Sequence, residues 1–378
     1  MTPEQDQIRD LAREFADNEI LPHAAEWDRE SELPREVIAK LGELGFLGML
    51  IPEEWDGLGL DVLSYLVALE EIARGDASVA VAMSVHNSLP TQMILANGSP
   101  EQKERWLKPM ARGELLGAFS LSEPDSGSDA ASMQAQARRV DGGWVLNGAK
   151  AWVTNGGFGD VVVTMVRTDE PANRRGSRGI GAFIVPTDTQ GYVVGRKEDK
   201  MGQRASETVG VAFEEMFIPD DQVLGDPDHG FIYAMQGLNG GRMGIAALAL
   251  GIAQAALDHA VAYAGERRQF GKAIKDFQGM QFKLANMATR VEAARGLLHR
   301  AAAAKEAGRK VNSIASMAKL FASETAMYVT TEAIQVFGGY GYVKEYPVEK
   351  LFRDAKVTEI YEGTSEIQRT VIARELYR

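Results

Sequence analysis

The chain has 378 residues, a formal net charge of -12 and no cysteine. The acidic balance excludes a broad basic surface for nucleic acid, and the absence of cysteine excludes disulfides, a thiolate nucleophile and cysteine-ligated zinc. A chain of this length exceeds what one hydrophobic core usually organises, so two or three domains and chemistry on a small molecule are expected.

Histidine is the remaining residue type with a strong preference for metals. The five histidines (His23, His86, His229, His259 and His299) lie far apart in the sequence, with no ligand-like spacing. Each is therefore interpreted as structural, and no metal site is predicted.

The N-terminus reads as the start of a helix. Thr2-Pro3-Glu4-Gln5 has the pattern of an N-cap, a first-turn proline and a capping-box partner. A fold that begins at residue 2 is expected to leave no room for a signal or transit peptide, and no apolar run is expected to approach the roughly 20 residues that span a bilayer. We expect a cytoplasmic protein without membrane insertion.

Residues 1–115 are predicted to form an N-terminal helical domain. Helix starts are indicated at Pro34 and at Ser99-Pro100-Glu101-Gln102, and apolar residues recur at helical spacing over 63–73. The methionines of 83–93 are interpreted as helical core packing.

Residues 116–225 are predicted to form a β domain. Residues 138–146 read as a hairpin that turns at Asp141-Gly142-Gly143, and short β-rich runs follow at 161–166 and 182–185. No long helical pattern separates these strands and no Gly-x-Gly-x-x-Gly follows one. The pattern therefore favours a barrel or a sandwich over a Rossmann fold.

Residues 226–378 are predicted to form a helical bundle. Long periodic segments cover 243–263, 278–306 and 313–337, and their alanine-rich faces allow close helix packing. The predicted fold is thus multidomain α and β: an N-terminal helical domain, a middle β-barrel-like domain and a C-terminal four-helix bundle.

Two segments of the β domain have side chains suited to a flat polar ring. Residues 119–129 start in a strand and end in a serine- and glycine-rich loop, whose alternative interpretation is a surface turn. Trp152 and Thr154 are expected on one side of a strand, where an aromatic face and a hydroxyl could receive a ring. The alternative there is a core tryptophan at a strand end.

Two segments of the bundle have features suited to phosphate. Residues 266–272, Glu-Arg-Arg-Gln-Phe-Gly-Lys, are expected to close a long helix with cations, which suit either a helix C-terminus or a pyrophosphate. Residues 335–341 end another helix in a run of glycines. More than one glycine there exceeds a simple helix stop and would let the backbone approach a ligand.

Glu362 stands in Tyr361-Glu362-Gly363-Thr364-Ser365-Glu366, just ahead of a helical run. A carboxylate on a short loop at a helix N-terminus is positioned to act as a general base. Taken alone, the pattern is more often that of a solvated turn.

Together, in this order and spacing, these segments resemble the acyl-CoA dehydrogenase family, and most closely its short-chain (butyryl-CoA) branch. The resemblance covers essentially the whole chain and implies the family's helix-barrel-helix fold. It implies FAD as cofactor and an acyl-CoA as substrate, electron transfer to an electron-transferring flavoprotein, and a homotetramer built as a dimer of dimers.

The resemblance also implies a role for particular residues. Glu362 matches the catalytic base. The Ser122 and Thr154 hydroxyls would lie on the polar edge of the flavin, with Trp152 beside it. The full set of implied FAD contacts is Phe119, Leu121, Ser122, Gly127, Ser128, Trp152, Val153, Thr154, Arg267, Phe270, Gln278, Gln335, Val336, Gly338, Gly339, Thr364 and Glu366.

Part of this set would serve a neighbouring subunit. Arg267, Gln278 and the 335–339 segment match positions that bind the ADP half of the neighbour's FAD. Substrate contacts are implied for Ser128, Asn239, Arg242, Tyr361 and Gly363. Some family members carry the base on the 239–242 helix, but here that position is Gly241, so Glu362 has no rival.

The implied reaction is α,β-dehydrogenation of a short- to medium-chain acyl-CoA, straight or branched, to the trans-2-enoyl-CoA. Asn239-Gly240-Gly241-Arg242 also occurs in isobutyryl-CoA dehydrogenases, which keeps branched substrates open. Two alternatives stay open: a flavin monooxygenase or oxidase on the same fold, and a helical scaffold without catalysis.

Overall fold

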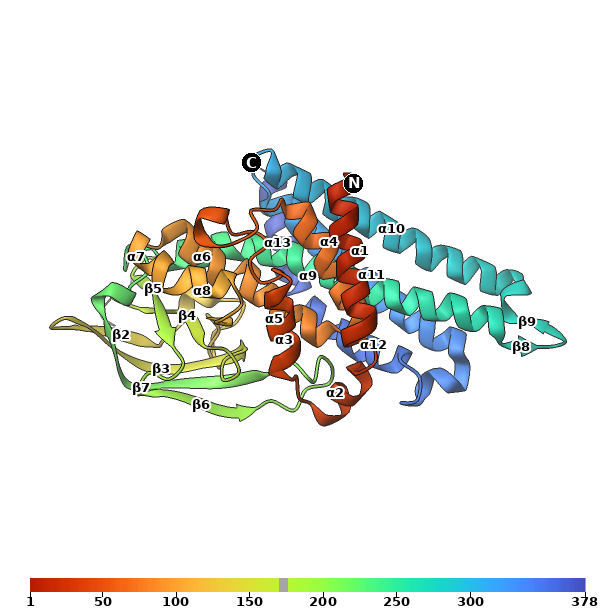
Figure 1. Ribbon diagram of the computed structural model, residues 1–378, viewed down its shortest axis with the longest axis horizontal. Coiled ribbons are helices and arrows are strands. Elements are labelled where there is room, and N and C mark those ends of the chain that lie inside the picture. Colours follow the sequence, from red (N-terminus) through yellow and green to blue (C-terminus); the bar gives the residue numbers. More distant parts are fainter. Residues whose placement is uncertain (170–175, 378) are drawn as a thin grey trace.

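The computed structural model describes residues 1–169 and 176–377 and has three parts (Figure 1). A β-sheet occupies one end of the long axis, long helices extend to the other end, and the N-terminal helices lie in the middle against both. This arrangement confirms the predicted fold class of helical, β and helical parts.

The N-terminal part is helical, as predicted. Both predicted capping boxes are present, at Thr2 with Gln5 and at Ser99 with Gln102. Its helices are α1 (Pro3–Phe15), α2 (Ala24–Glu30), α3 (Arg35–Glu43), α4 (Val62–Gly75), α5 (Ala77–Ser88), α6 (Pro90–Asn97), α7 (Pro100–Gln102) and α8 (Lys108–Ala111).

The methionine-rich stretch packs in the core, as expected, although it spans two helices. Met83 on α5 and Met93 on α6 are both buried. The helix is interrupted between them at Leu89, because Pro90 has no backbone N–H with which to continue α5.

The middle part is one curled seven-stranded sheet. β2 and β3 form the predicted hairpin, with Arg139 opposite Trp144, whereas β1 pairs parallel to β4. Strands follow the order β1-β4-β2-β3-β7-β6, with β5 on the other side of β4. The strands are β1 (Gly117–Ser120), β2 (Gln136–Val140), β3 (Gly143–Thr154), β4 (Val161–Arg167), β5 (Ile180–Pro186), β6 (Tyr192–Lys197) and β7 (Thr208–Pro219).

The C-terminal part is a bundle around α9, which packs against α11, α4, α10 and α5. A small hairpin of β8 (Arg268–Gln269) and β9 (Lys272–Ala273) follows α9 at the far end of the molecule (Figure 1). The helices are α9 (Gly230–Glu266), α10 (Gln278–Glu306), α11 (Asn312–Phe337), α12 (Val348–Lys356) and α13 (Ser365–Leu376).

The expectation that no apolar run approaches membrane-spanning length needs correction at α9. By length and composition alone this helix is long and apolar enough to cross a bilayer. Most of its apolar stretch is buried against other helices of the protein, as in a core helix. A β-carbon on Gly251 would lie 2.3 Å from the Glu70 carbonyl oxygen, so α9 touches α4 backbone to backbone.

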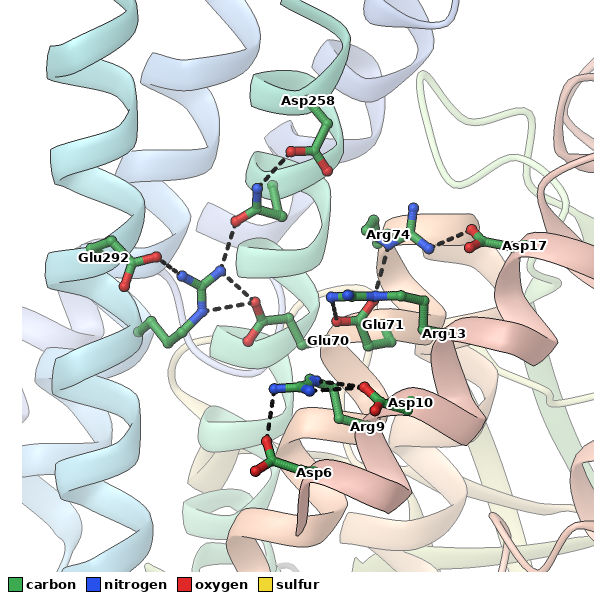
Figure 2. Close-up of polar contacts among 12 residues, drawn as sticks. Asp6, Arg9, Asp10, Arg13, Asp17, Glu70, Glu71, Arg74, Asp258 and Glu292 are labelled. Atoms are coloured by element: carbon green, nitrogen blue, oxygen red, sulfur yellow. Dashed lines mark hydrogen bonds and ion pairs between the residues drawn. The ribbon is translucent and has the colours of Figure 1, made fainter. Parts of the chain in front are cut away.

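Charged side chains join the N-terminal helices to the bundle (Figure 2). Glu71 accepts hydrogen bonds from Arg13 at 2.6 Å and Arg74 at 3.0 Å, within the N-terminal part. Glu70 accepts one from Arg295 of α10 at 2.7 Å. We call Arg13, Glu70, Glu71, Arg74 and Arg295 the interface cluster.

Candidate active site

The predicted base stands on a short loop before a helix, as expected. Thr364 is the N-cap of α13, where its hydroxyl accepts a hydrogen bond from the Ile367 amide. Glu362 has φ 52° and Gly363 has φ 93°. Left-handed backbone at a non-glycine residue is uncommon and persists only where the surroundings hold it.

The Glu362 carboxylate is buried and unpaired. Both of its oxygens are shielded from solvent and lack a hydrogen-bond partner among residues 1–169 and 176–377, although the rest of the residue is partly exposed. Burial raises the pKa of this carboxyl to about 7, while the nearby cations Lys319 and Arg242 oppose the rise. A carboxyl with a pKa near neutrality is suited to moving a proton at physiological pH.

Gly241 makes room for this carboxylate. A β-carbon at position 241 would lie 1.8 Å from Glu362 Oε2. The backbone of α9 therefore lies directly against the base, and no larger residue fits at position 241 while Glu362 keeps this position.

The predicted substrate residues Asn239 and Arg242 lie on the same part of α9. Arg242 Nη1 donates to Asn239 Oδ1 at 2.9 Å, and its Nε has no partner. Burial lowers the pKa of this guanidinium, and the Glu362 charge opposes that change. Two buried groups of opposite charge thus keep free polar atoms at one place, which is typical of a site that receives a polar ligand.

Sequence reasoning missed the residues that hold the base loop. Lys319 Nζ and Gln368 Nε2 each donate to the Gly363 carbonyl oxygen at 2.8 Å. Both side chains are fully buried. The sequence does contain a feature that could have identified Lys319. It is a lysine within the apolar run Ala318-Lys319-Leu320-Phe321, on a helix predicted to pack in the core.

Tyr361 is tied to the other two parts of the fold by a buried polar chain. The Tyr361 hydroxyl accepts a hydrogen bond from Gln203 Nε2 at 3.1 Å, and the backbone amide of Gln203 donates one to Asp354 Oδ1. Lys350 Nζ forms ion pairs with both Asp354, at 2.6 Å, and Asp76, at 2.7 Å. Asp76 is the N-cap of α5. These contacts connect the base loop with the sheet domain and the N-terminal helices, and neither sequence spacing nor motif indicated them.

The first group of predicted FAD residues gathers on the sheet. Phe119 lies in β1, and Leu121 and Ser122 follow that strand. Trp152, Val153 and Thr154 end β3, and Gly127 and Ser128 are exposed on the intervening loop. The buried Glu123 carboxylate fixes this loop, since it accepts from Lys150 Nζ at 2.8 Å and from the Gln134 and Ala135 amides.

Trp152 differs from the prediction in its local geometry. The register of β3 against β7 shifts between Lys150 and Val153, and Trp152 has φ 61°, so regular strand alternation does not hold there. Its side chain is 66% exposed, which excludes the core-tryptophan alternative in this chain. An outward indole beside the partly exposed Thr154 forms an open aromatic and polar wall.

The second group lies at the opposite end of the molecule, near the β8–β9 hairpin (Figure 1). This segment ends a long helix as expected, because α9 ends at Glu266 and the cation Arg267 is its C-cap, in extended backbone. The Arg267 guanidinium lies over the Tyr340 ring at 5.5 Å, which joins the hairpin to the glycine segment after α11. Phe270 is 93% exposed, and Gln278, Gln335, Gly338 and Gly339 are also exposed, whereas Val336 is buried.

A cavity of about 700 Å³ lies elsewhere, between α1, α4, α9 and α10, and is lined by the interface cluster. None of the predicted site residues lines it. Its arginines are committed to carboxylates (Figure 2), so it offers a ligand no free cation of that set. Within 1–169 and 176–377, no three His, Cys, Asp or Glu side chains are grouped for a metal ion.

Comparison with known proteins agrees with this geometry. Residues 2–114, 118–216 and 228–377 match the N-terminal, middle and C-terminal domains of acyl-CoA dehydrogenases. The short-chain specific acyl-CoA dehydrogenase of Rattus norvegicus mitochondria is 50% identical over 100% of this chain and 91% of its own.

Solved structures match as closely. Butyryl-CoA dehydrogenase from Megasphaera elsdenii has TM-score 0.98 and 44% identity, covering 100% of this chain and 99% of the other. A chain in the structure of the electron transferring flavoprotein of Acidaminococcus fermentans has TM-score 0.98 and 45% identity, with the same coverage.

The protein is an oxidoreductase, and the chain belongs to the acyl-CoA dehydrogenase family. Acyl-CoA dehydrogenases are FAD-dependent. The residues present fit that cofactor: an exposed indole, the partly exposed hydroxyls of Ser122 and Thr154, and the rigid loop behind them form a surface for a flat polar ring.

Proposed function

We propose that the protein dehydrogenates a short- to medium-chain acyl-CoA, straight or branched, to the trans-2-enoyl-CoA, with Glu362 removing the α-proton. The observation that carries the proposal is the Glu362 carboxylate, buried, without a hydrogen-bond partner, and with a pKa raised to about 7. An unsatisfied buried polar atom destabilises the fold by about 1–3 kcal/mol. A carboxylate that is kept buried despite this cost is therefore expected to have a function.

The environment of Glu362 suits proton removal from carbon. A desolvated carboxylate is a stronger base than one in water, and a positioned general base contributes about 10²- to 10⁴-fold. The residues that would hold FAD are those of the sheet wall, and bound FAD supplies the two-electron acceptor for the β-hydrogen. Glu362 and Arg242 would lie against the acyl group, where the free Arg242 Nε can donate to a substrate oxygen.

A short acyl chain is favoured by the packing beyond the base. One turn along α9 from Gly241, a β-carbon on Gly244 would lie 2.6 Å from Ser84 Oγ and 3.4 Å from the Tyr65 hydroxyl. These side chains are buried and fill the space next to α9. Turnover with a series of straight and branched acyl-CoAs, from four to sixteen carbons, would test this preference.

Glu362→Gln tests the proposed base. The amide keeps size and shape but cannot accept a proton, so FAD content and butyryl-CoA binding should persist while anaerobic flavin bleaching slows by at least about 10²-fold. Stopped-flow absorbance measures the rate, and equilibrium titration measures binding. Near-native bleaching in this variant would mean that another group takes the proton.

We further infer a homotetramer built as a dimer of dimers, in which one subunit's hairpin end binds part of its neighbour's FAD. The inference is supported by the position of one group of predicted FAD residues on the sheet and of the other by the β8–β9 hairpin, at the far end of the helices (Figure 1). Exposed aromatic residues at the hairpin end, Phe270 and Tyr342, fit burial by a second subunit.

Arg267→Ala should weaken FAD retention by removing a cation from the pyrophosphate site, whereas the matched hairpin variant Arg268→Ala should not. Gel filtration followed by absorbance measures the retained FAD, and sedimentation gives the oligomeric state. A monomer that keeps a full complement of FAD would refute the shared site.

We also propose that electrons leave to an electron-transferring flavoprotein. Support comes from the near-identical fold of the chain in the Acidaminococcus fermentans structure. Turnover with such a flavoprotein should greatly exceed turnover with oxygen as the sole acceptor. Equal rates with both acceptors would favour an oxidase instead.

A further inference from the structure

Lys319 is an unusual residue for the middle of α11. Its side chain has 0% exposure and is flanked along the helix by the buried Ala315, Ala318 and Ala322. No carboxylate of the described residues forms an ion pair with it within 4.0 Å. An ammonium in such surroundings is expensive to bury, and burial lowers the pKa of Lys319 to about 8. A purely structural position would be filled at lower cost by methionine or leucine.

Within residues 1–169 and 176–377, the only hydrogen bond of the amine is with the base loop. Lys319 Nζ donates to the Gly363 carbonyl oxygen at 2.8 Å, and Gln368 Nε2 donates to the same oxygen at 2.8 Å and to the Glu362 carbonyl oxygen at 3.3 Å. The peptide between Glu362 and Thr364 is therefore held from two helices, α11 and α13. Such a clamp explains how the left-handed backbone of Glu362 persists.

Few charges act on this pair. The groups that influence Glu362 are Lys319 on α11 and Arg242 on α9, both cationic. The Tyr65 and Tyr361 hydroxyls also face it, and burial holds the pKa of each above its usual value, so both stay neutral. Lys319 itself is influenced by Glu362, Arg242, Glu359 and Glu366. Glu366 is exposed and Glu359 is ion-paired with Lys356, which leaves Lys319, Arg242 and Glu362 as the inner charged groups.

We propose that Lys319 is a positioning residue for the base: its ammonium clamps the Gly363 carbonyl and places an unpaired positive charge beside the Glu362 carboxylate. The proposal rests on the proposed role of Glu362 and assigns the reason why this carboxylate is available as an anion despite its burial. The amine forms no covalent bond and transfers no proton in this role.

The two parts of the role can be separated by substitution. Lys319→Met keeps the length and removes both the donor and the charge. Lys319→Gln keeps a neutral donor that can reach toward the carbonyl. Lys200→Met is the matched control, because Lys200 Nζ also donates to a backbone carbonyl, that of Ser206, at 2.6 Å but has no contact with Glu362.

Titration of Glu362 in the FAD-loaded enzyme tests the charge without turnover. Infrared difference spectra across pH follow its protonated carboxyl band, which the Glu362→Gln variant identifies by its loss. We expect both Lys319 variants to move the midpoint upward by about one pH unit, since a nearby opposite charge is worth about one to three units. An unchanged midpoint in both variants overturns the proposal, and Lys200→Met should leave it unchanged.

Flavin bleaching by butyryl-CoA across pH tests the clamp. At pH 7 both variants should be at least about fivefold slower than wild type, because a midpoint raised by about one unit leaves about a tenth of Glu362 anionic instead of about a half. Above pH 9, Lys319→Gln should approach the wild-type rate while Lys319→Met stays below it, with butyryl-CoA binding little changed. Equal high-pH rates in the two variants overturn the clamp. Should Lys319→Met fail to fold, Lys319→Gln and its titration still decide the charge.

Failure here and failure of the proposed function give different results. If Glu362→Gln bleaches at the wild-type rate, Glu362 is not the base, whatever Lys319 does. If Glu362→Gln is inactive but the Lys319 variants leave the Glu362 midpoint in place, the base stands and Lys319 is merely structural.

Discussion

Two clusters of buried charge in this protein are built in opposite ways. In the interface cluster, each arginine lies against a carboxylate, as with Arg295 and Glu70 at 2.7 Å (Figure 2). At the base, Glu362 has no hydrogen-bond partner, and Arg242 and Lys319 stand near it without an ion pair within 4.0 Å among the described residues. The first arrangement joins domains, and the second keeps charges available.

The contrast between paired and unpaired charges distinguishes charged groups that stabilise the fold from charged groups that could take part in a reaction. The interface cluster lines the cavity of about 700 Å³, yet its charges are satisfied. The base site is not marked by that cavity, but its polar atoms are unsatisfied. Unpaired buried charge is therefore the better guide here than empty volume.

The strongest test of the contrast is Gly241→Ala. The new methyl group would lie 1.8 Å from Glu362 Oε2, so the carboxylate must move. We expect flavin bleaching to slow by about 10²-fold, since a displacement of about 1 Å can cost that much. Gly265→Ala on the same helix meets no atom within 4 Å and serves as the control. An unaltered rate in Gly241→Ala would show that the carboxylate needs no fixed place.

Arg295→Met tests the other cluster. It leaves the buried Glu70 carboxylate without its partner and should destabilise the protein by about 2 kcal/mol, below the ~3–5 of a fully buried pair because Arg295 is partly exposed. The urea midpoint measures the loss. The bleaching rate of the folded enzyme should stay within about threefold of wild type; a large loss of rate with native stability would place this cluster in catalysis.

The stability of Glu362→Gln should depend on pH. Burial raises the pKa of the folded carboxyl from 4.5 to about 7, so the folded state keeps its proton longer than the unfolded state. Wild-type stability therefore falls as the pH rises from about 4.5 to 7, and the variant lacks this loss. Melting at pH 5 and pH 8 should give the variant an advantage of about 1–2 kcal/mol only at pH 8; an equal advantage at both would contradict the raised pKa.

The smallest effect is expected at the exposed ion pair of Lys40 and Glu19. Both side chains are about half exposed, so solvent screens their attraction. Lys40→Ala should change the urea midpoint by the equivalent of at most about 0.5 kcal/mol. A change as large as that of Arg295→Met would mean that solvent exposure does not predict how much an ion pair contributes to the free energy of unfolding of this protein.

Local sequence patterns predicted correctly those features that depend on interactions between neighbouring residues. The capping boxes at Thr2 and Ser99 and the β2–β3 hairpin turn are set by residues within a few positions of each other, and the structure has them as predicted. Glu362 could be singled out because its loop and the N-cap Thr364 lie within two residues. The geometry at Trp152 was misjudged because a bulge depends on pairing with a distant strand, here β7.

The sequence by itself determined the order of helical, β and helical parts, the family to which the chain is similar, and the identity of the candidate base. Only the tertiary structure decided which charges stay unpaired, because pairing depends on elements far apart in the sequence, 58 residues for Arg13 and Glu71 and 225 for Glu70 and Arg295. Gly241, Lys319 and Glu362 meet because α9, α11 and the base loop pack together. The strength of a base is a property of its surroundings, so it is a result of packing that no local pattern encodes.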